Sequence, residues 1–148
     1  GPFTPERAGS LPTQDLLEMA FSGKPDKKTL QGRLVGQGGL VAYLGTADAQ
    51  RVEEMIAAGE EKAGLIFAAM AYQVAKDIGA MATVLRGRVD GIVLTGGLAH
   101  SGRLTSLIAA RVRFLAPVHI YPGEDEMYAL AEGGLRVLAG EEEIKVYG

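Results

Sequence analysis

A glycine-rich segment at positions 95–102, Thr-Gly-Gly-Leu-Ala-His-Ser-Gly, has residue types that suit close contact with a phosphate-bearing ligand. Glycine has no Cβ to hold a ligand away from the main chain, and the free amides that open a helix favour negative charge. The segment follows an apolar run, 92–94, and precedes a helical pattern. We therefore expect it at the carboxyl edge of a sheet, where open α/β folds bind ligands.

This glycine segment does not match the known phosphate-loop patterns. It lacks both the Gly-Lys-Ser/Thr ending of a P-loop and the Gly-x-Gly-x-x-Gly of a dinucleotide-binding fold. On spacing alone it is equally compatible with a plain strand-to-helix turn, and His100 with an ordinary loop histidine.

Three carboxylates, Glu124, Asp125 and Glu126, stand at the start of the last predicted helix. Helix capping and the helix dipole explain such a cluster without any ligand. The cluster nevertheless follows the second predicted strand, at the same sheet edge as the glycine segment, and could hold a hydrated Mg²⁺ that faces phosphates. The acidic run 141–143 is most simply a solvated surface.

Two further residues have a structural and a chemical interpretation. Arg7 lies in a proline-rich opening that could present its guanidinium to phosphate or carboxylate oxygens, although an exposed arginine is the commoner outcome. Asp48 precedes a helical pattern, so it is either a helix cap or an acceptor for a ribose hydroxyl.

The composition is that of an ordinary soluble domain. The chain has 148 residues, of which 47% are hydrophobic and 22% charged, so disorder is not expected. A net charge of -3 argues against a nucleic-acid-binding protein. The absence of cysteine excludes disulfides, thiolate zinc sites and a cysteine nucleophile, and two histidines make an all-protein zinc site unfavourable.

The elements predicted from the pattern place these residues. Charged and polar side chains at 73, 76 and 77 interrupt the longest apolar stretch, so we expect no membrane span. The start of the chain does not resemble a signal peptide, and the expected location is the cytoplasm.

Thr13 and Asp26 are expected as helix caps. The pattern predicts helices over 13–21, 26–35, 49–58, 60–85, 104–115 and 127–138, a short β-prone stretch at 40–44, strands at 92–94 and 118–121, and a third strand or frayed tail at 144–147.

The organisation predicted is an opening loop, 1–12, a helical region, 13–88, and an α/β region, 89–148. Strand, helix, strand predicts parallel pairing, and the 92–94 strand, apolar throughout, is expected to be buried on both faces. Two or three strands make an incomplete sheet with uncovered edges. We expect the missing strands to precede Gly1, and association into a homo-oligomer is compatible with such edges.

Four segments in order resemble the C-terminal part of the butyrate kinase family, within the acetate kinase branch of the actin-like ATPases. They are Gly-Pro-Phe-Thr-Pro-Glu-Arg-Ala-Gly at 1–9, Leu-Val-Ala-Tyr-Leu-Gly-Thr at 40–46, Ile-Val-Leu-Thr-Gly-Gly-Leu-Ala-His-Ser at 92–101 and Tyr-Pro-Gly-Glu-Asp-Glu-Met at 121–127. The resemblance runs to about Gly140. It implies a partial ribonuclease-H-like α/β domain with a helical insertion.

The resemblance also implies a function, reversible phosphate transfer from ATP to butanoate with Mg²⁺, giving ADP and butanoyl phosphate. It implies that Arg7 neutralises the transferring phosphate and that Glu126 lies near the metal. The adenosine side of the site is implied for Asp48, Ala49 and Gln50 together with Gly96, Gly97, Leu98, Ala99, His100 and Ser101. Gln50 departs from the arginine that acetate kinases carry there, and Ala99, His100 and Ser101 depart from their Gly-Glu-Asn.

The family's two phosphate loops and its carboxylate-binding surface are absent from these 148 residues. Because phosphoryl transfer depends on positioning and charge stabilisation, we expect this chain alone to be inactive and to need the N-terminal domain of the same polypeptide. The alternatives are a non-catalytic nucleotide-binding or assembly module, and a ligand-free structural fragment whose glycines only turn the chain.

Overall fold

The long helix α5 (Glu61–Val84) is the element against which the other helices of the core pack. The computed structural model describes residues 1–123, 126–144 and 146, without the side chain of Glu126. Along α5 one stripe is buried and the opposite side is exposed, as the sequence spacing predicted. The buried residues of the stripe are Ala63, Phe67, Met70, Ala71, Ala75 and Ala82.

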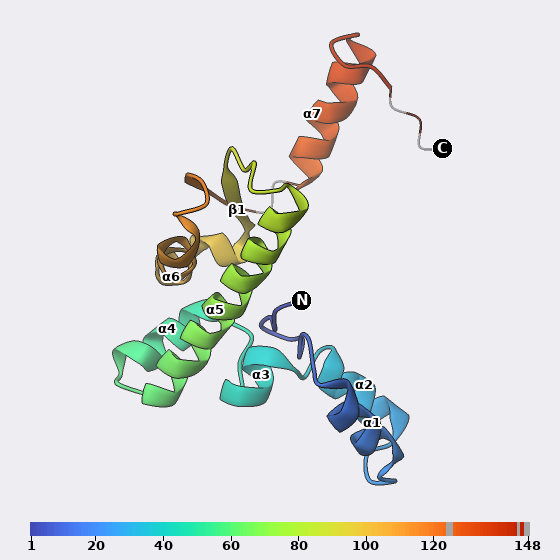
Figure 1. Ribbon diagram of the computed structural model, residues 1–148, viewed down its shortest axis with the longest axis vertical. Helices are drawn as coiled ribbons and strands as arrows, with labels where there is room; N and C mark the ends of the chain where they lie inside the picture. The colour runs from blue at the N-terminus through green and yellow to red at the C-terminus, as the bar shows by residue number, and fades with distance from the viewer. Residues whose placement is uncertain (124–125, 145, 147–148) are drawn as a thin grey trace.

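Helix α6 (Gly102–Val112) packs against α5, and the two strands of the sheet lie on either side of α6 in the chain (Figure 1). Its buried residues Leu104, Ile108 and Val112 recur every fourth position and join the core that contains Phe67. The strands β1 (Ile92–Gly96) and β2 (Val118–Pro122) flank α6 in the chain and pair in parallel, from Ile92 opposite Val118 to Gly96 opposite Pro122. Parallel pairing across this helix is therefore confirmed.

Only one face of the sheet is covered. Ile92 is 8% exposed and belongs to the core, whereas Val93, on the opposite face of the pleat, is 60% exposed. The expectation that β1 is buried on both faces is therefore wrong for the described residues, because the packed helices α5 and α6 supply a core on one side of the strand alone. Tyr121 of β2 is also largely exposed.

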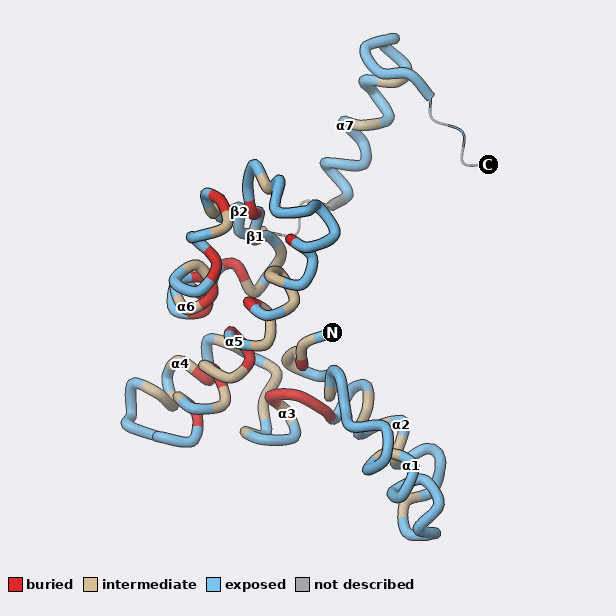
Figure 2. Tube along the Cα trace, in the orientation of Figure 1, coloured by how far each residue is buried: buried red, intermediate tan, exposed pale blue. Residues whose placement is uncertain are grey.

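The N-terminal half consists of short helices: α1 (Thr13–Phe21), α2 (Lys27–Leu34), α3 (Gly39–Leu44) and α4 (Ala49–Ala57). Helices α1 and α2 have no buried residues and extend away from α5 (Figures 1 and 2). The predicted cap Thr13 is wrong by one position, since the N-cap is Pro12 and makes no side-chain hydrogen bond. Asp26 is confirmed as the cap of α2, and the hydrogen bond that it accepts from Thr29 lowers the pKa of its carboxyl.

Helix α3 corrects the prediction of a β-prone stretch at 40–44. The amides of Leu40 and Val41 donate to the carbonyl oxygens of Thr4 and Pro5, at 3.2 and 3.0 Å. The opening loop thus satisfies amides that the first turn of a helix leaves unpaired, and this tertiary contact overrides the local strand preference of the sequence.

The C-terminal helix α7 (Glu126–Leu138) stands clear of the other elements (Figure 1). Leu130, Leu135 and Leu138 on it are exposed. The predicted third strand at 144–147 falls partly on Lys145 and Tyr147, which lie outside the described residues, while Ile144 and Val146 are not in a strand.

Helix α5 is also long and apolar enough to cross a membrane, with a mean hydropathy of 1.2 over an 18-residue window. The expectation that no such stretch exists is therefore wrong by this criterion, because the polar residues within it are too few to lower the average. Phe67 and Ala71 of the same helix are fully buried within the protein core. Since the core helix of a soluble protein passes the same test, this is weak support for a membrane span.

The contact between the opening loop and α3 predicts a strong effect of Gly39→Ala. Gly39 has φ +57°, and an added Cβ would overlap the Thr4 carbonyl oxygen. Backbone strain of about 1–2 kcal/mol and steric overlap should together lower the free energy of unfolding by about 3 kcal/mol. The control is Gly59→Ala, where φ is +88° but the space for a Cβ is open. Equal losses in urea denaturation of the two variants would contradict this arrangement.

Candidate functional site

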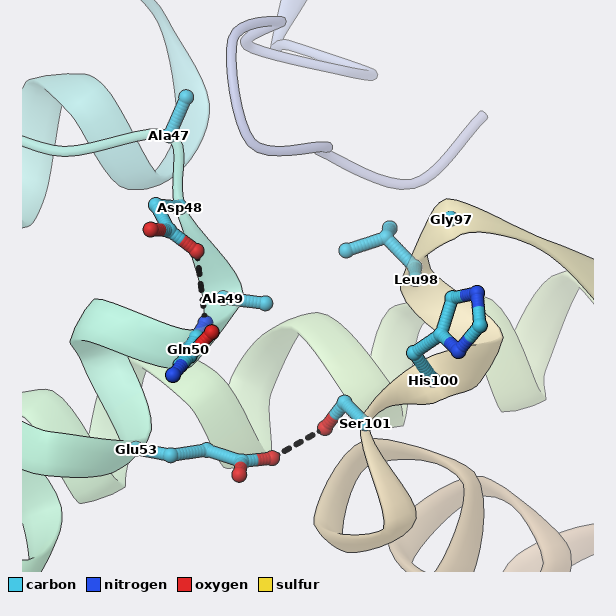
Figure 3. Close-up of a pocket in the computed structure, with 9 residues that line it drawn as sticks. All are labelled: Ala47, Asp48, Ala49, Gln50, Glu53, Gly97, Leu98, His100 and Ser101. Carbon is cyan, nitrogen blue, oxygen red and sulfur yellow. Dashed lines mark hydrogen bonds between the residues drawn. The ribbon is translucent and has the colours of Figure 1, made fainter. Parts of the chain in front are cut away.

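A cavity of about 810 Å³ lies between the start of α4 and the turn that follows β1 (Figure 3). The two sides come from segments about fifty residues apart in the sequence, both carried by elements that pack around α5. We call residues 47–50 and 53 the α4 wall and residues 97, 98, 100 and 101 the glycine wall. The lining residues are Ala47, Asp48, Ala49, Gln50, Glu53, Gly97, Leu98, His100 and Ser101.

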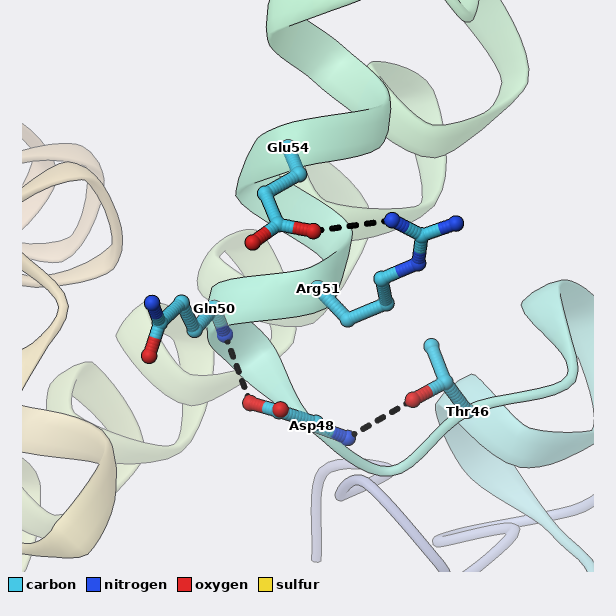
Figure 4. A network of polar contacts seen from close by, with 5 residues as sticks. All are labelled: Thr46, Asp48, Gln50, Arg51 and Glu54. Carbon is cyan, nitrogen blue, oxygen red and sulfur yellow. Dashed lines mark hydrogen bonds and ion pairs between the residues drawn. The ribbon is translucent and has the colours of Figure 1, made fainter.

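Asp48 orders the α4 wall. It is the N-cap of α4 and accepts a hydrogen bond of 2.9 Å from the amide of Gln50, while its own amide donates to Thr46 Oγ1 at 3.1 Å (Figure 4). Arg51 and Glu54, which follow on the same helix, form an exposed ion pair of 2.8 Å and do not line the cavity. The capping interpretation of Asp48 is confirmed, and its position in the cavity leaves the second interpretation open as a proposal.

The glycine wall begins where β1 ends. Gly96 has φ +85°, which favours glycine, and nothing lies within 4 Å of the position that a Cβ would take. The chain then forms the short 3₁₀ helix η1 (Gly97–His100). Leu98 and His100 line the cavity, whereas Ala99 is buried and lines an apolar hollow that it shares with Phe3 and Met70. The turn thus presents Gly97, Leu98 and His100 to the cavity and Ala99 to the core, and Leu98 also lines the apolar hollow.

Ser101 joins the two walls. Its hydroxyl donates to Glu53 Oε1 and accepts a hydrogen bond of 3.0 Å from the amide of Leu104, which makes it the N-cap of α6. The side chain of Ser101 is 8% exposed. Glu53 was not expected from the sequence, although it lies one helical turn after Ala49 and so on the same face of α4.

The charges of the cavity favour a particular part of a ligand. Asp48 and Glu53 supply carboxylates, Gln50 supplies an amide and His100 an imidazole, and among the described residues no lysine or arginine lines the cavity. Hydrogen-bond acceptors without cations suit the neutral hydroxyl and amino groups of a nucleoside better than they suit phosphates. Phosphate groups would have to be held outside this cavity.

Three predicted site residues, Arg7, Gly96 and Ala99, are not among the described residues that line the cavity. Arg7 is exposed, and its backbone forms an isolated bridge with Val35. Glu126 is the first residue of α7, and its side chain, like Glu124 and Asp125, lies outside what the structure describes. The amide of Gly123 donates to the carbonyl oxygen of Gly96 at 3.4 Å, which places the start of the turn before α7 beside the glycine bend.

Comparisons with known proteins give a consistent result. A sequence profile of the Acetokinase family matches residues 23–122. The chain is 55% identical to a protein named "Probable butyrate kinase 2" from Caldanaerobacter subterraneus subsp. tengcongensis, over all 148 residues of this chain and 42% of that relative. The chain thus spans less than half of the relative's length.

Solved structures share the fold. An acetate kinase from Porphyromonas gingivalis superposes with a TM-score of 0.78 over 93% of this chain and 41% of that one, at 19% identity. A propionate kinase from Francisella tularensis gives a TM-score of 0.69 over 78% of this chain and 30% of that one, at 22% identity. At these identities the likeness concerns the fold.

The geometry of the α4 wall predicts the stability of two Asp48 variants. Asp48→Ala removes the acceptor for the amide of Gln50 and should lower the free energy of unfolding by about 1 kcal/mol. Asp48→Asn keeps an oxygen at that position and should stay within about 0.5 kcal/mol of the parent. Urea denaturation measures both, and an equal loss in the two variants would show that the cap is not the source of the stability.

Proposed function

The chain belongs to the acetokinase family, and we propose that the protein containing it transfers a phosphoryl group between ATP and a short-chain carboxylic acid, with butanoate as the substrate. In this reaction a carboxylate oxygen of the acid bonds to the γ-phosphorus of ATP, and the bond from that phosphorus to the β–γ bridging oxygen breaks. The products are butanoyl phosphate and ADP. The 55% identity to the probable butyrate kinase supports the choice of acid.

The fold agrees with this family. The small parallel sheet with packed helices is the expected part of an actin-like ATPase domain, as the likeness to the acetate kinase structures shows. Open α/β sheets bind ligands at the carboxyl ends of their strands, and β1 ends at Gly96, beside the cavity.

The observation that carries the proposal is the cavity between the α4 wall and the glycine wall. It places Asp48, Ala49 and Gln50 opposite Gly97, Leu98, His100 and Ser101. We assign it to the adenosine part of ATP, with Leu98 and Ala49 as apolar contacts and Asp48 as an acceptor for a ribose hydroxyl. Gly96 contributes open space beside its main chain, into which a ligand fits without a Cβ in the way.

Two further residues, Arg7 and Glu126, are proposed to act on the phosphates and the metal. Arg7 is proposed to neutralise the transferring phosphate, since its exposed guanidinium is free of any ion pair among the described residues. Glu126 is proposed to lie near Mg²⁺, which would neutralise phosphate charge when bound. No group of three carboxylate or histidine side chains that could hold a metal occurs among the described residues.

The uncovered surfaces support a partner within the same polypeptide. The open sheet face carries Val93 and Tyr121, and α7 carries Leu138, all more than half exposed. Apolar surface of this extent is usually covered by other polypeptide. We propose that the part of the protein corresponding to the rest of the relative's length covers these surfaces and supplies the phosphate-binding loops.

A second function, nucleotide binding without catalysis, is favoured by one observation. Among the described residues, the cavity lining supplies polar groups for a nucleoside and no lysine or arginine for phosphoryl transfer. This alternative places the protein among nucleotide-responsive assembly modules.

The catalytic proposal is tested by butanoyl phosphate formation. The full-length protein is expected to form it from ATP, Mg²⁺ and butanoate, detected by trapping with hydroxylamine, and the 148-residue chain alone is expected to form none because the groups that position the phosphates are absent. ATP binding by the full-length protein without product would favour the second function. Product from the 148-residue chain would contradict the proposed division of the site.

A matched pair of variants tests the assignment of the cavity. Asp48→Ala and Asp26→Ala each remove an aspartate that caps a helix, but only Asp48 lines the cavity. In the full-length protein, Asp48→Ala should weaken ADP binding about tenfold, because the ribose loses a charged acceptor. Asp26→Ala should leave the dissociation constant unchanged. Calorimetric titration that finds equal affinities for the two variants would exclude the proposed ribose contact.

A further inference from the structure

The hydrogen bond between Ser101 and Glu53 runs from one wall of the cavity to the other. Among the described residues it is the one hydrogen bond that joins the α4 wall to the glycine wall. The two residues are 48 positions apart in the chain. The bond therefore ties together two segments that are otherwise connected through the core.

The hydroxyl of Ser101 already makes two hydrogen bonds within the protein. Its single proton is donated to Glu53, and its oxygen accepts from the amide of Leu104 at 3.0 Å. With the side chain 8% exposed, Ser101 has no proton left to donate to a ligand. Ser101 therefore contributes to the cavity through its hydrogen bond to Glu53 and not by donating to the nucleoside.

The helices behind the two walls are anchored in the core. Val52, beside Glu53 on α4, is fully buried, and Leu104, three residues after Ser101, is 3% exposed. These anchors, with Ala49 at the start of α4, hold the two helices against the core, and the hydrogen bond between Glu53 and Ser101 adds a direct polar link between the two walls. Figure 3 shows the side chain of Glu53 reaching from α4 toward Ser101 at one end of the cavity, away from Asp48.

We propose that Glu53 is a positioning residue: by accepting the hydroxyl proton of Ser101 it fixes the spacing between the α4 wall and the glycine wall. Glu53 acts through Ser101 and does not need to touch the nucleotide. This inference rests on the proposed function, because it concerns the affinity of the same cavity. A preset spacing lowers the ordering cost of binding, since the walls need not be brought together by the ligand.

The test uses the full-length protein and four variants at these positions. Glu53→Ala removes the acceptor, and Ser101→Ala removes the donor together with the side-chain cap of α6. Each should raise the dissociation constants of ADP and of adenosine and the KM for ATP about tenfold, with kcat changed by less than about twofold. Glu53→Gln keeps an oxygen that can accept from Ser101 and should bind within about twofold of the parent. Glu53→Asp keeps the charge but is one methylene too short, and should resemble Glu53→Ala.

The matched control is Glu54→Ala. Glu54 is the adjacent glutamate on α4, but it pairs with Arg51 on the exposed side and does not line the cavity. This variant should have unchanged affinity and KM. Thermal unfolding of each variant identifies any that fail to fold, and the Gln and Asp pair still separates the outcomes if Glu53→Ala is one of them.

The double variant Glu53→Ala/Ser101→Ala completes the test. If the two residues act through their mutual bond, its loss of affinity should equal that of the worse single variant. Additive losses, an unchanged affinity in Glu53→Ala, or a loss in Glu53→Gln as large as in Glu53→Ala would each overturn the inference. A parent protein that binds neither ADP nor adenosine would instead overturn the proposed function, and the inference with it.

Discussion

The burial of one stripe of α5 is the interaction on which the rest of the described structure depends. Phe67 and Met70 on this stripe are almost completely inaccessible to solvent, and the core around them includes residues of α4, α6 and β1. The stripe is rich in alanine, which lets neighbouring helices approach closely. Because burying apolar surface is the main favourable contribution to folding, the elements that carry both walls of the cavity are held by this one helix.

In this arrangement the residues that position the two walls differ from the residues that face the cavity. The anchors Val52 and Leu104 face the core, while Asp48, Gln50 and His100 on the neighbouring turns face the cavity. The apolar residues decide where each helix lies, and the polar residues decide what the cavity can bind. Polar groups at helix starts are suitable for this purpose because the first amides of a helix need partners in any case.

The same arrangement explains the character of the cavity. Both walls are built from helix starts and a glycine bend, and of their five polar side chains Asp48 and Ser101 are helix caps. The result is a cavity with acceptors and without cations, in contrast to a P-loop, where a lysine contacts the phosphates. A site of this kind needs other parts of a protein to bind the phosphates and neutralise their charge.

Local patterns in the sequence determined much of this protein. The pattern of apolar residues over 60–85 predicted α5, and the apolar runs on either side of α6 predicted the parallel pair of strands, because periodicity and turn residues act within one segment. The caps Asp26 and Asp48 and the glycine bend after β1 were predicted for the same reason.

Tertiary structure alone decided the rest. Helix α3 formed because the carbonyl oxygens of the opening loop accept its first amides, and the sheet kept an open face because α5 and α6 cover only the other. The pairing of Glu53 with Ser101 depends on how α4 and α6 lie on α5, and no local pattern encodes a contact between residues 48 positions apart. The sequence determines which residues can make a hydrogen bond, and the packing of distant helices determines which of them meet.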